Sequence, residues 1–101
     1  MTHNKLVRDR IPEIIEKNGQ TAVTRVLNEY EYRDELERKL DEEVAEFHEG
    51  GSLEELADIL EVVYALAKTK GCSLERFLRE YQRKHEQRGG FDDRIYLIRT
   101  E

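Results

Sequence analysis

Apolar residues recur every three to four positions over three long segments of the chain, which is the spacing of an amphipathic helix. These segments are residues 28–49, 52–70 and 73–88. Each opens on asparagine or serine, which are preferred residues at the start of a helix, and glycines follow each segment within a few residues. The pattern therefore predicts three long helices in succession.

Shorter elements flank the long helices. Pro12 lies in the first turn of a short helix that begins at Ile11, and Gly19 ends that helix. Residues 21–27 alternate and are rich in β-branched side chains, as are residues 94–99, so both predict strands. Two isolated short strands persist only when they pair with each other and pack on helices. The predicted fold is all-α, a helical bundle around an antiparallel helix hairpin, with a small two-stranded β-ribbon.

The helix predicted over residues 52–70 is apolar on two sides. One stripe contains Leu53, Leu56, Ala57, Leu60, Val63, Tyr64 and Ala67, and another contains Ile59, Val62 and Leu66. A helix that is apolar on two sides is buried on two sides. One side serves the core of the chain itself. We expect the second stripe, with Val62 at its centre, to meet another subunit, so the protein is predicted to be at least a homodimer.

Two acidic pairs lie symmetrically about the chain reversal at residues 50–52. They are Glu43 with Glu46 and Glu55 with Asp58. The spacing of three residues places both members of a pair on one helical face. Folding the two helices back on each other brings the four carboxylates together. Such a cluster repels itself unless a cation is bound, and oxygen ligands at this density suit Mg²⁺ or Mn²⁺.

Each carboxylate also has a structural interpretation. Glu55 is the third helical residue after Ser52, the spacing of a capping box, in which the glutamate hydrogen-bonds to the backbone at the start of its own helix. Glu46 fits an ordinary exposed position. The symmetry about the turn and the placement of three of these residues on apolar seams favour the metal site.

Composition and charge limit the class of protein. A chain of 101 residues makes one domain. Its 40% charged residues and mean hydropathy of −0.83 are compatible with disorder, but the apolar periodicity indicates a folded, thinly cored domain. The single cysteine, Cys72, excludes an internal disulfide framework and fits the cytoplasm. No run has membrane-spanning length. A net charge of −6 argues against a nucleic-acid polymer as partner, although not against a nucleotide.

Several blocks of the sequence occur together in a known superfamily. Residues 39–46, KLDEEVAE, followed by residues 55–58, ELAD, resemble the E-x-x-E…E-x-x-D signature of MazG-like all-α nucleoside triphosphate pyrophosphohydrolases. Residues 4–12 and 84–91 resemble a compact single-domain branch that is similar to phosphoribosyl-ATP pyrophosphohydrolases. The resemblance covers nearly all of residues 1–101. The gap between the two acidic pairs is short, so elements that set base specificity in other members are absent.

The resemblance implies Mg²⁺-dependent hydrolysis of a nucleoside triphosphate to the monophosphate and pyrophosphate, a reaction that clears aberrant or surplus nucleotides. Glu43, Glu46, Glu55 and Asp58 would bind the metal, and Glu46 or Glu42 would orient the attacking water. Lys39, Lys84 and Arg88 are candidates to bind phosphate oxygens, and Lys5 and Arg8 could complete the pocket. For Lys5 and Arg8, a salt bridge that fixes the N-terminal segment to the bundle is an equal alternative.

Two other functions remain open at this point. The first keeps the chemistry and takes phosphoribosyl-ATP as the substrate, which would be a biosynthetic role. The second is a helical dimerisation module without catalysis, which would use the same apolar seams and would not respond to divalent metal.

Overall fold

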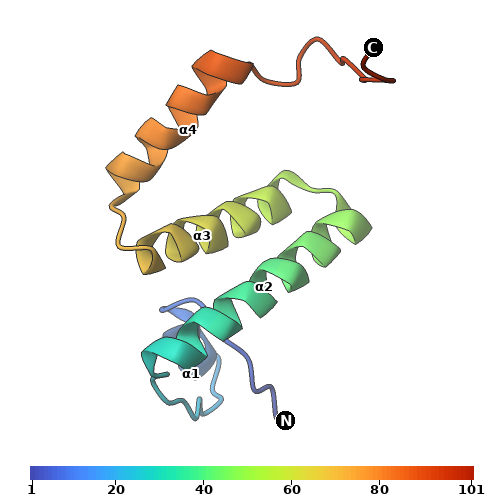
Figure 1. The fold of residues 1–101 in the computed structure, drawn as a ribbon. Coiled ribbons are helices and arrows are strands. Elements are labelled where there is room, and N and C mark those ends of the chain that lie inside the picture. The colour runs from blue at the N-terminus through green and yellow to red at the C-terminus, as the bar shows by residue number, and fades with distance from the viewer.

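The computed structural model describes all 101 residues and contains four helices and no strand. The helices are α1 (Ile11–Lys17), α2 (Glu29–Gly50), α3 (Leu53–Thr69) and α4 (Leu74–Arg88). Helices α2 and α3 form an antiparallel hairpin, and α4 leaves the far end of α3 at an angle (Figure 1). The all-α class and the central hairpin are therefore confirmed. None of the helices is both long and apolar enough to cross a membrane.

Local capping explains where the long helices begin. The Asn28 side chain accepts from the Glu31 backbone N–H at 2.9 Å, and the Glu31 carboxylate accepts from the Asn28 N–H at 3.2 Å. Ser52 and Ser73 each accept a backbone N–H three residues further on, at 3.2 Å. Gly51 adopts a left-handed conformation with φ of 68°, which favours glycine and ends α2. Only two residues then separate the two arms of the hairpin.

The core of the hairpin is thin. Leu36 from α2 and Val62 from α3 are 3% and 7% exposed, and only one other residue of the chain is buried. Ile59 and Leu66, which share a face of α3 with Val62, are half-buried. Among the helices, α3 packs mainly against α2, so this face of α3 is the inner face of the hairpin.

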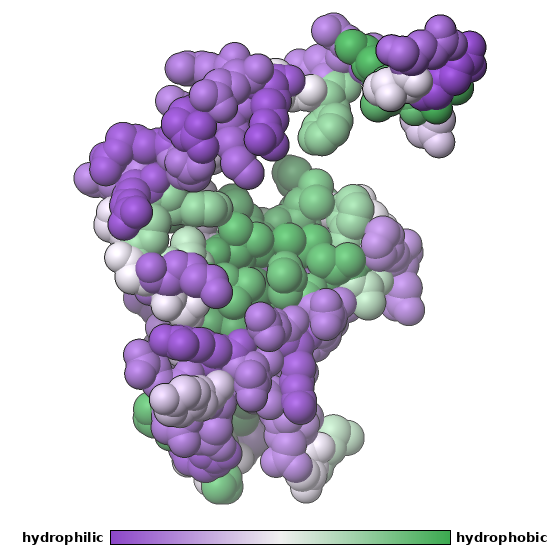
Figure 2. Space-filling model, viewed as in Figure 1, coloured by the Kyte–Doolittle hydropathy of each residue, from purple (hydrophilic) through white to green (hydrophobic).

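The prediction that this face of α3 meets another subunit is therefore wrong. The Ile59–Val62–Leu66 stripe packs within the chain, and the leucines of the other stripe are left exposed. Leu53 is 82% exposed, and Leu56 and Leu60 are 45% and 47% exposed. Figure 2 shows this apolar surface over the middle of the molecule, open toward α4. Periodicity identified two apolar faces correctly, but it could not say which one α2 would cover.

The predicted β-ribbon is also not formed. Residues 21–27 and 94–99 lie at opposite ends of a molecule 61 Å long, one beside the start of α2 and the other beyond α4 (Figure 1). A strand needs a partner for its backbone N–H and C=O groups. Neither segment can reach the other within this chain, so both are extended or irregular.

Helix α4 is joined to the rest of the protein at one point. Its apolar stripe consists of Leu74, Phe77, Leu78 and Tyr81. Phe77 packs edge-to-face on Tyr64 of α3, with ring centroids 6.0 Å apart. The other three stripe residues are exposed, and α4 contacts no helix except α3. This chain alone therefore leaves most of the α4 stripe uncovered.

Candidate active site on the helix hairpin

The hairpin places one carboxylate in its interior. Glu43 lies on the inner face of α2, two turns beyond Leu36, and is 7% exposed. The heptad spacing of these two residues puts them on one side of the helix. Glu43 is the one charged residue of the chain that is buried. A carboxylate in this position costs free energy unless its charge is compensated.

Compensation of Glu43 is incomplete. Its Oε1 lies 3.5 Å from the Lys39 Nζ, one helical turn earlier. Its Oε2 is buried and has no hydrogen-bond partner in the protein. The Lys39 ammonium is shared with Glu42, whose Oε1 lies 3.4 Å away. One cation therefore serves two acids, and a polar atom that would bind a proton or a cation is left without a partner.

The surroundings of Glu43 favour its protonated form. Burial raises the pKa of the Glu43 carboxyl above its ordinary value of 4.5, and the neighbouring Glu46 and, to a smaller extent, Asp58 raise it further. Lys39 acts in the opposite direction. Glu46 and Asp58 are therefore both close to Glu43. The symmetry about the turn predicted that Asp58 would lie near Glu43.

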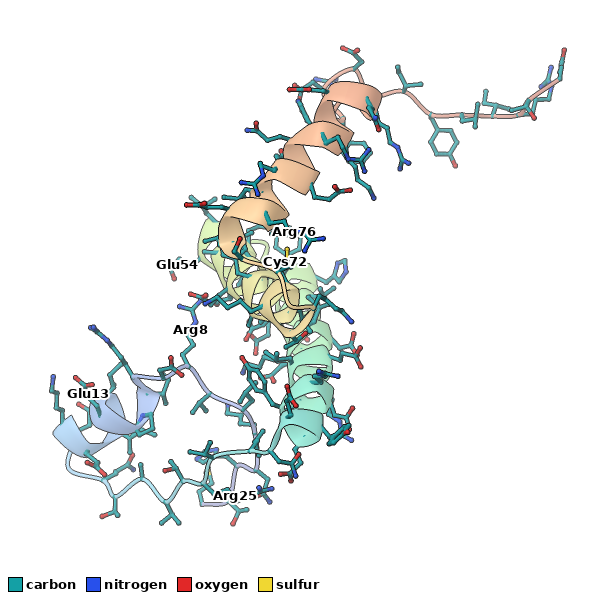
Figure 3. The ribbon with its side chains drawn as sticks, turned by 60° about the vertical axis from the view of Figure 1, so that its left-hand side comes forward. Arg8, Glu13, Arg25, Glu54, Cys72 and Arg76 are labelled. Atoms are coloured by element: carbon teal, nitrogen blue, oxygen red, sulfur yellow. The ribbon has the colours of Figure 1, made fainter.

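An arginine from outside the hairpin binds the third acid. The Arg8 Nη2 lies 3.1 Å from the Asp58 Oδ1. Arg8 belongs to the segment before α1, and its side chain extends from that segment toward the hairpin (Figure 3). This is the salt bridge that the sequence left as an alternative for Arg8. It places a positive charge where a cation bound to Asp58 would otherwise be needed.

The fourth acid points toward the turn. The Glu55 Oε2 accepts from the Ser52 backbone N–H at 3.3 Å, and the Ser52 hydroxyl accepts from the Glu55 N–H at 3.2 Å. A Cβ atom at Gly50 would overlap the Glu55 carboxylate, so the missing side chain of Gly50 makes room for it. In the sequence, Gly50 stands out only as part of a turn. Its position just before a capping box was the signal for this second role.

The donor chemistry suits a hard divalent cation, but the side chains are not gathered around a common point. No group of three or more His, Cys, Asp or Glu side chains is close enough to hold a metal ion. Carboxylate oxygens are the ligands that Mg²⁺ prefers, and the unpartnered Oε2 of Glu43 offers one. Asp58 would have to leave Arg8, and Glu55 would have to leave the turn, before all four acids could bind one ion.

The remaining predicted substrate ligands lie apart from this cluster. Lys5, Lys84 and Arg88 are exposed and form no ion pair. Lys84 and Arg88 are on α4, which does not contact α2. The structure thus brings Arg8, Lys39, Glu42, Glu43, Glu46 and Asp58 together on the hairpin. It does not bring the C-terminal basic residues to them within one chain.

Two shallow hollows on the surface lie on α4, away from the acids. Their volumes are about 340 and 300 Å³, and they are lined by α4 residues alone, from Glu75 to Glu86. A hollow lined by one helix cannot enclose a nucleotide. The acids are therefore a better guide to the site than the shape of the single chain.

Comparison with known proteins gives one partial match. Forty-two residues of the chain are 60% identical to part of a protein of Mycolicibacterium smegmatis that is described only as an uncharacterized protein. The match spans 42% of this chain and 43% of that protein, which is less than half of either. No protein-family model and no solved structure matches the chain. Residues of the hairpin are therefore the main indication of what the protein does.

Proposed function

We propose that the protein is a Mg²⁺-dependent hydrolase that converts a nucleoside triphosphate to the monophosphate and pyrophosphate. The observation that supports the proposal most is the environment of Glu43. A buried carboxyl with an unpartnered oxygen lies beside Glu46 and Asp58 in the E-x-x-E…E-x-x-D pattern. A structural role alone would be met more cheaply by an apolar side chain at this position.

In this proposal Glu43, Glu46 and Asp58 would hold the metal, and Glu55 would join them after leaving the turn. A Mg²⁺ ion held there would supply charge neutralisation for the triphosphate and activation of water. Glu42 or Glu46 accepts the proton of the attacking water. Arg8 and Lys39, which neutralise acids in the present structure, turn to phosphate oxygens, where an arginine makes two parallel hydrogen bonds.

The proposal includes self-association, for which the extent of the surface is the main support. The chain exposes 9525 Å², whereas a compact monomer of 12.0 kDa exposes about 6,000 Å². The difference is larger than the roughly 1,000 to 2,500 Å² that each chain of an obligate dimer buries. The radius of gyration is 17.7 Å, against about 13 Å for a compact domain of this length.

A panel of nucleotides tests the catalytic proposal. The full chain is incubated with each ribo- and deoxyribonucleoside triphosphate and with phosphoribosyl-ATP, in Mg²⁺ or Mn²⁺. Pyrophosphate and orthophosphate are measured separately. The proposal predicts pyrophosphate release that depends on the metal. Orthophosphate as the only product, or no turnover of any substrate, would show that it is wrong.

The non-catalytic module remains the second candidate because two observations favour it. Glu55 is engaged in a cap, and the acids are not gathered into a metal cage. This candidate predicts that Mg²⁺ leaves the melting temperature unchanged. The hydrolase proposal predicts a rise in the melting temperature that grows with the concentration of Mg²⁺, because the ion binds the folded state.

A further inference from the structure

Two segments of the chain have strand-forming residues but no strand. The backbone groups of residues 21–27 and 95–101 take part in no backbone–backbone hydrogen bond. Val23 and Val26 are 95% and 97% exposed, and Ile95, Tyr96, Leu97 and Ile98 are between 74% and 88% exposed. β-Branched and aromatic side chains favour strands. An unpaired apolar segment of this kind is a template for pairing with another chain.

The distance between the two segments rules out their pairing within one chain in this structure. Residues 21–27 precede α2 at one end of the molecule, and residues 94–99 follow α4 at the other end (Figure 1). The longest extent of the molecule is 61 Å. The first segment is also fixed at its base, because Arg25 donates two hydrogen bonds to Glu31 at the start of α2, at 3.1 and 2.8 Å.

We infer that residues 95–99 of one copy pair with residues 21–27 of a second copy, in a two-stranded ribbon. When two copies lie side by side in opposite directions, each tail reaches the first segment of the other copy. A two-fold axis then forms both ribbons at once and closes the assembly at a dimer. Such a ribbon would join two chains, whereas no ribbon is formed within one chain.

Apolar surface between the two ends supports a second copy as the occupant. The outer face of α3, with Leu53, Leu56 and Leu60, is exposed along the middle of the molecule. Helix α4 leaves its own apolar stripe open on the way to the tail. A ribbon alone is only marginally stable in water and needs such a surface to pack on. The excess of exposed surface described under the proposed function is large enough for contacts by the ribbon and by the helices together.

The inference rests on the proposed self-association, and it is independent of the catalytic proposal. Cysteine cross-linking tests it in the full chain, with Cys72→Ser to remove the native thiol. One chain carries Val23→Cys. A second chain carries Ile95→Cys, Tyr96→Cys, Leu97→Cys or Ile98→Cys, so that each register is sampled. The two chains are mixed at micromolar concentration and oxidised, and a gel without reducing agent measures the products.

The expected product is a covalent dimer with one chain of each kind, at twice the 12.0 kDa mass of a chain. A disulfide requires Cα atoms about 4.4 to 6.8 Å apart, so only a paired register gives an efficient bond. The matched control replaces the tail cysteine with Gln82→Cys, on exposed α4. We expect its cross-linked fraction to be lower by at least about tenfold.

Other products identify which idea fails. No cross-link above the control in a protein that sediments as a dimer would overturn the ribbon and leave self-association standing. One further chain carries both Val23→Cys and Leu97→Cys; a disulfide within single copies of it, without covalent dimer, would also overturn the ribbon. A clean monomer at micromolar concentration would overturn both the ribbon and the self-association.

Shortening the chain to residues 1–90 provides a second test. The removed residues lie beyond the last helix, so we expect helical content by circular dichroism to be kept. Loss of both ribbons should weaken dimerisation by at least about 30-fold in the dissociation constant, as the loss of a binding hot spot does. An unchanged sedimentation profile would overturn the inference.

Discussion

In the α2–α3 hairpin, apolar side chains from two helices meet, and Leu36 and Val62 are buried between them. In the C-terminal arm, defined here as α4 with residues 89–101, apolar side chains meet almost nothing. Leu97 is 74% exposed and Phe91 is 96% exposed. Both regions follow amphipathic or strand-forming patterns. A single chain therefore buries the apolar side chains of the hairpin but leaves those of the C-terminal arm exposed.

Chemistry divides along the same line. The hairpin holds the acids of the candidate site, and the arm carries Lys84 and Arg88 without partners. In the proposed dimer the second copy would carry the same two cations on its own arm. Substitutions of the hairpin acids should therefore affect activity and metal binding, whereas substitutions in the arm should affect association.

The largest expected effect is on the hairpin, at Asp58. Asp58→Asn removes a charged oxygen donor, so we expect turnover to fall by at least about 100-fold, more than the loss of a residue that only supports a metal ligand. The Mg²⁺-dependent rise in melting temperature should disappear with the fold intact. Glu61→Gln, an exposed position of the same helix, is the control and should behave as wild type. Normal hydrolysis by Asp58→Asn would contradict the assignment.

A pair of leucine substitutions measures how far the two regions differ in burial. Leu36→Ala leaves a cavity in the hairpin and should lower the free energy of unfolding by about 2 to 5 kcal/mol. Leu78→Ala on α4, where the side chain is 41% exposed, should cost less in a diluted monomer than in the dimer. Urea unfolding at two protein concentrations separates these states. The same cost at both concentrations would show that α4 is not covered by a second copy.

A smaller effect separates capping from metal binding at the turn. Glutamine also serves at the third position of a capping box, so Glu55→Gln should change stability little. Ser52→Ala should lower the free energy of unfolding by about 1 kcal/mol and keep most of the activity. If Glu55 also binds the metal, Glu55→Gln alone lowers Mg²⁺ affinity, as measured by titration calorimetry. Retained affinity would restrict Glu55 to the cap.

The smallest expected effect is a pH dependence from Glu43. Because its pKa is raised on folding, the folded state binds the proton more tightly than the unfolded state does. Glu43 therefore makes the free energy of unfolding fall as the pH rises from 4.5 through the raised pKa. In Glu43→Gln this component should be absent without metal. The difference between the two unfolding curves across that pH range measures it, and parallel curves would show an ordinary pKa.

Much of the fold followed from the sequence because its signals are local. Asn28, Ser52 and Ser73 marked three helix starts, and glycines marked the ends. Features that depend on distant contacts could not be read this way. Periodicity shows that α3 has two apolar faces, but only packing decides that Val62 meets α2. Strand-forming segments were recognised, but not the distance that keeps them apart.

In the candidate site too, local spacing could be read from the sequence and distant contacts could not. Helical spacing correctly placed Glu43 near Asp58, because the turn between the helices fixes their register. It could not show that Arg8, fifty residues away in the sequence, binds Asp58. Helical spacing also could not decide whether Glu55 caps its helix at Ser52 or binds a metal, because this depends on the space beside Gly50.

The two-residue connection between α2 and α3 also has a kinetic consequence. Contacts that are close in sequence form quickly, and helical hairpins of this kind fold in microseconds to milliseconds. A ribbon between two chains requires an encounter, so its rate depends on protein concentration and extends from milliseconds to minutes. Newly made chains would therefore pass through a stage with a finished hairpin and free arms. Dilution would lengthen that stage, and it is then that these chains would be most prone to aggregate.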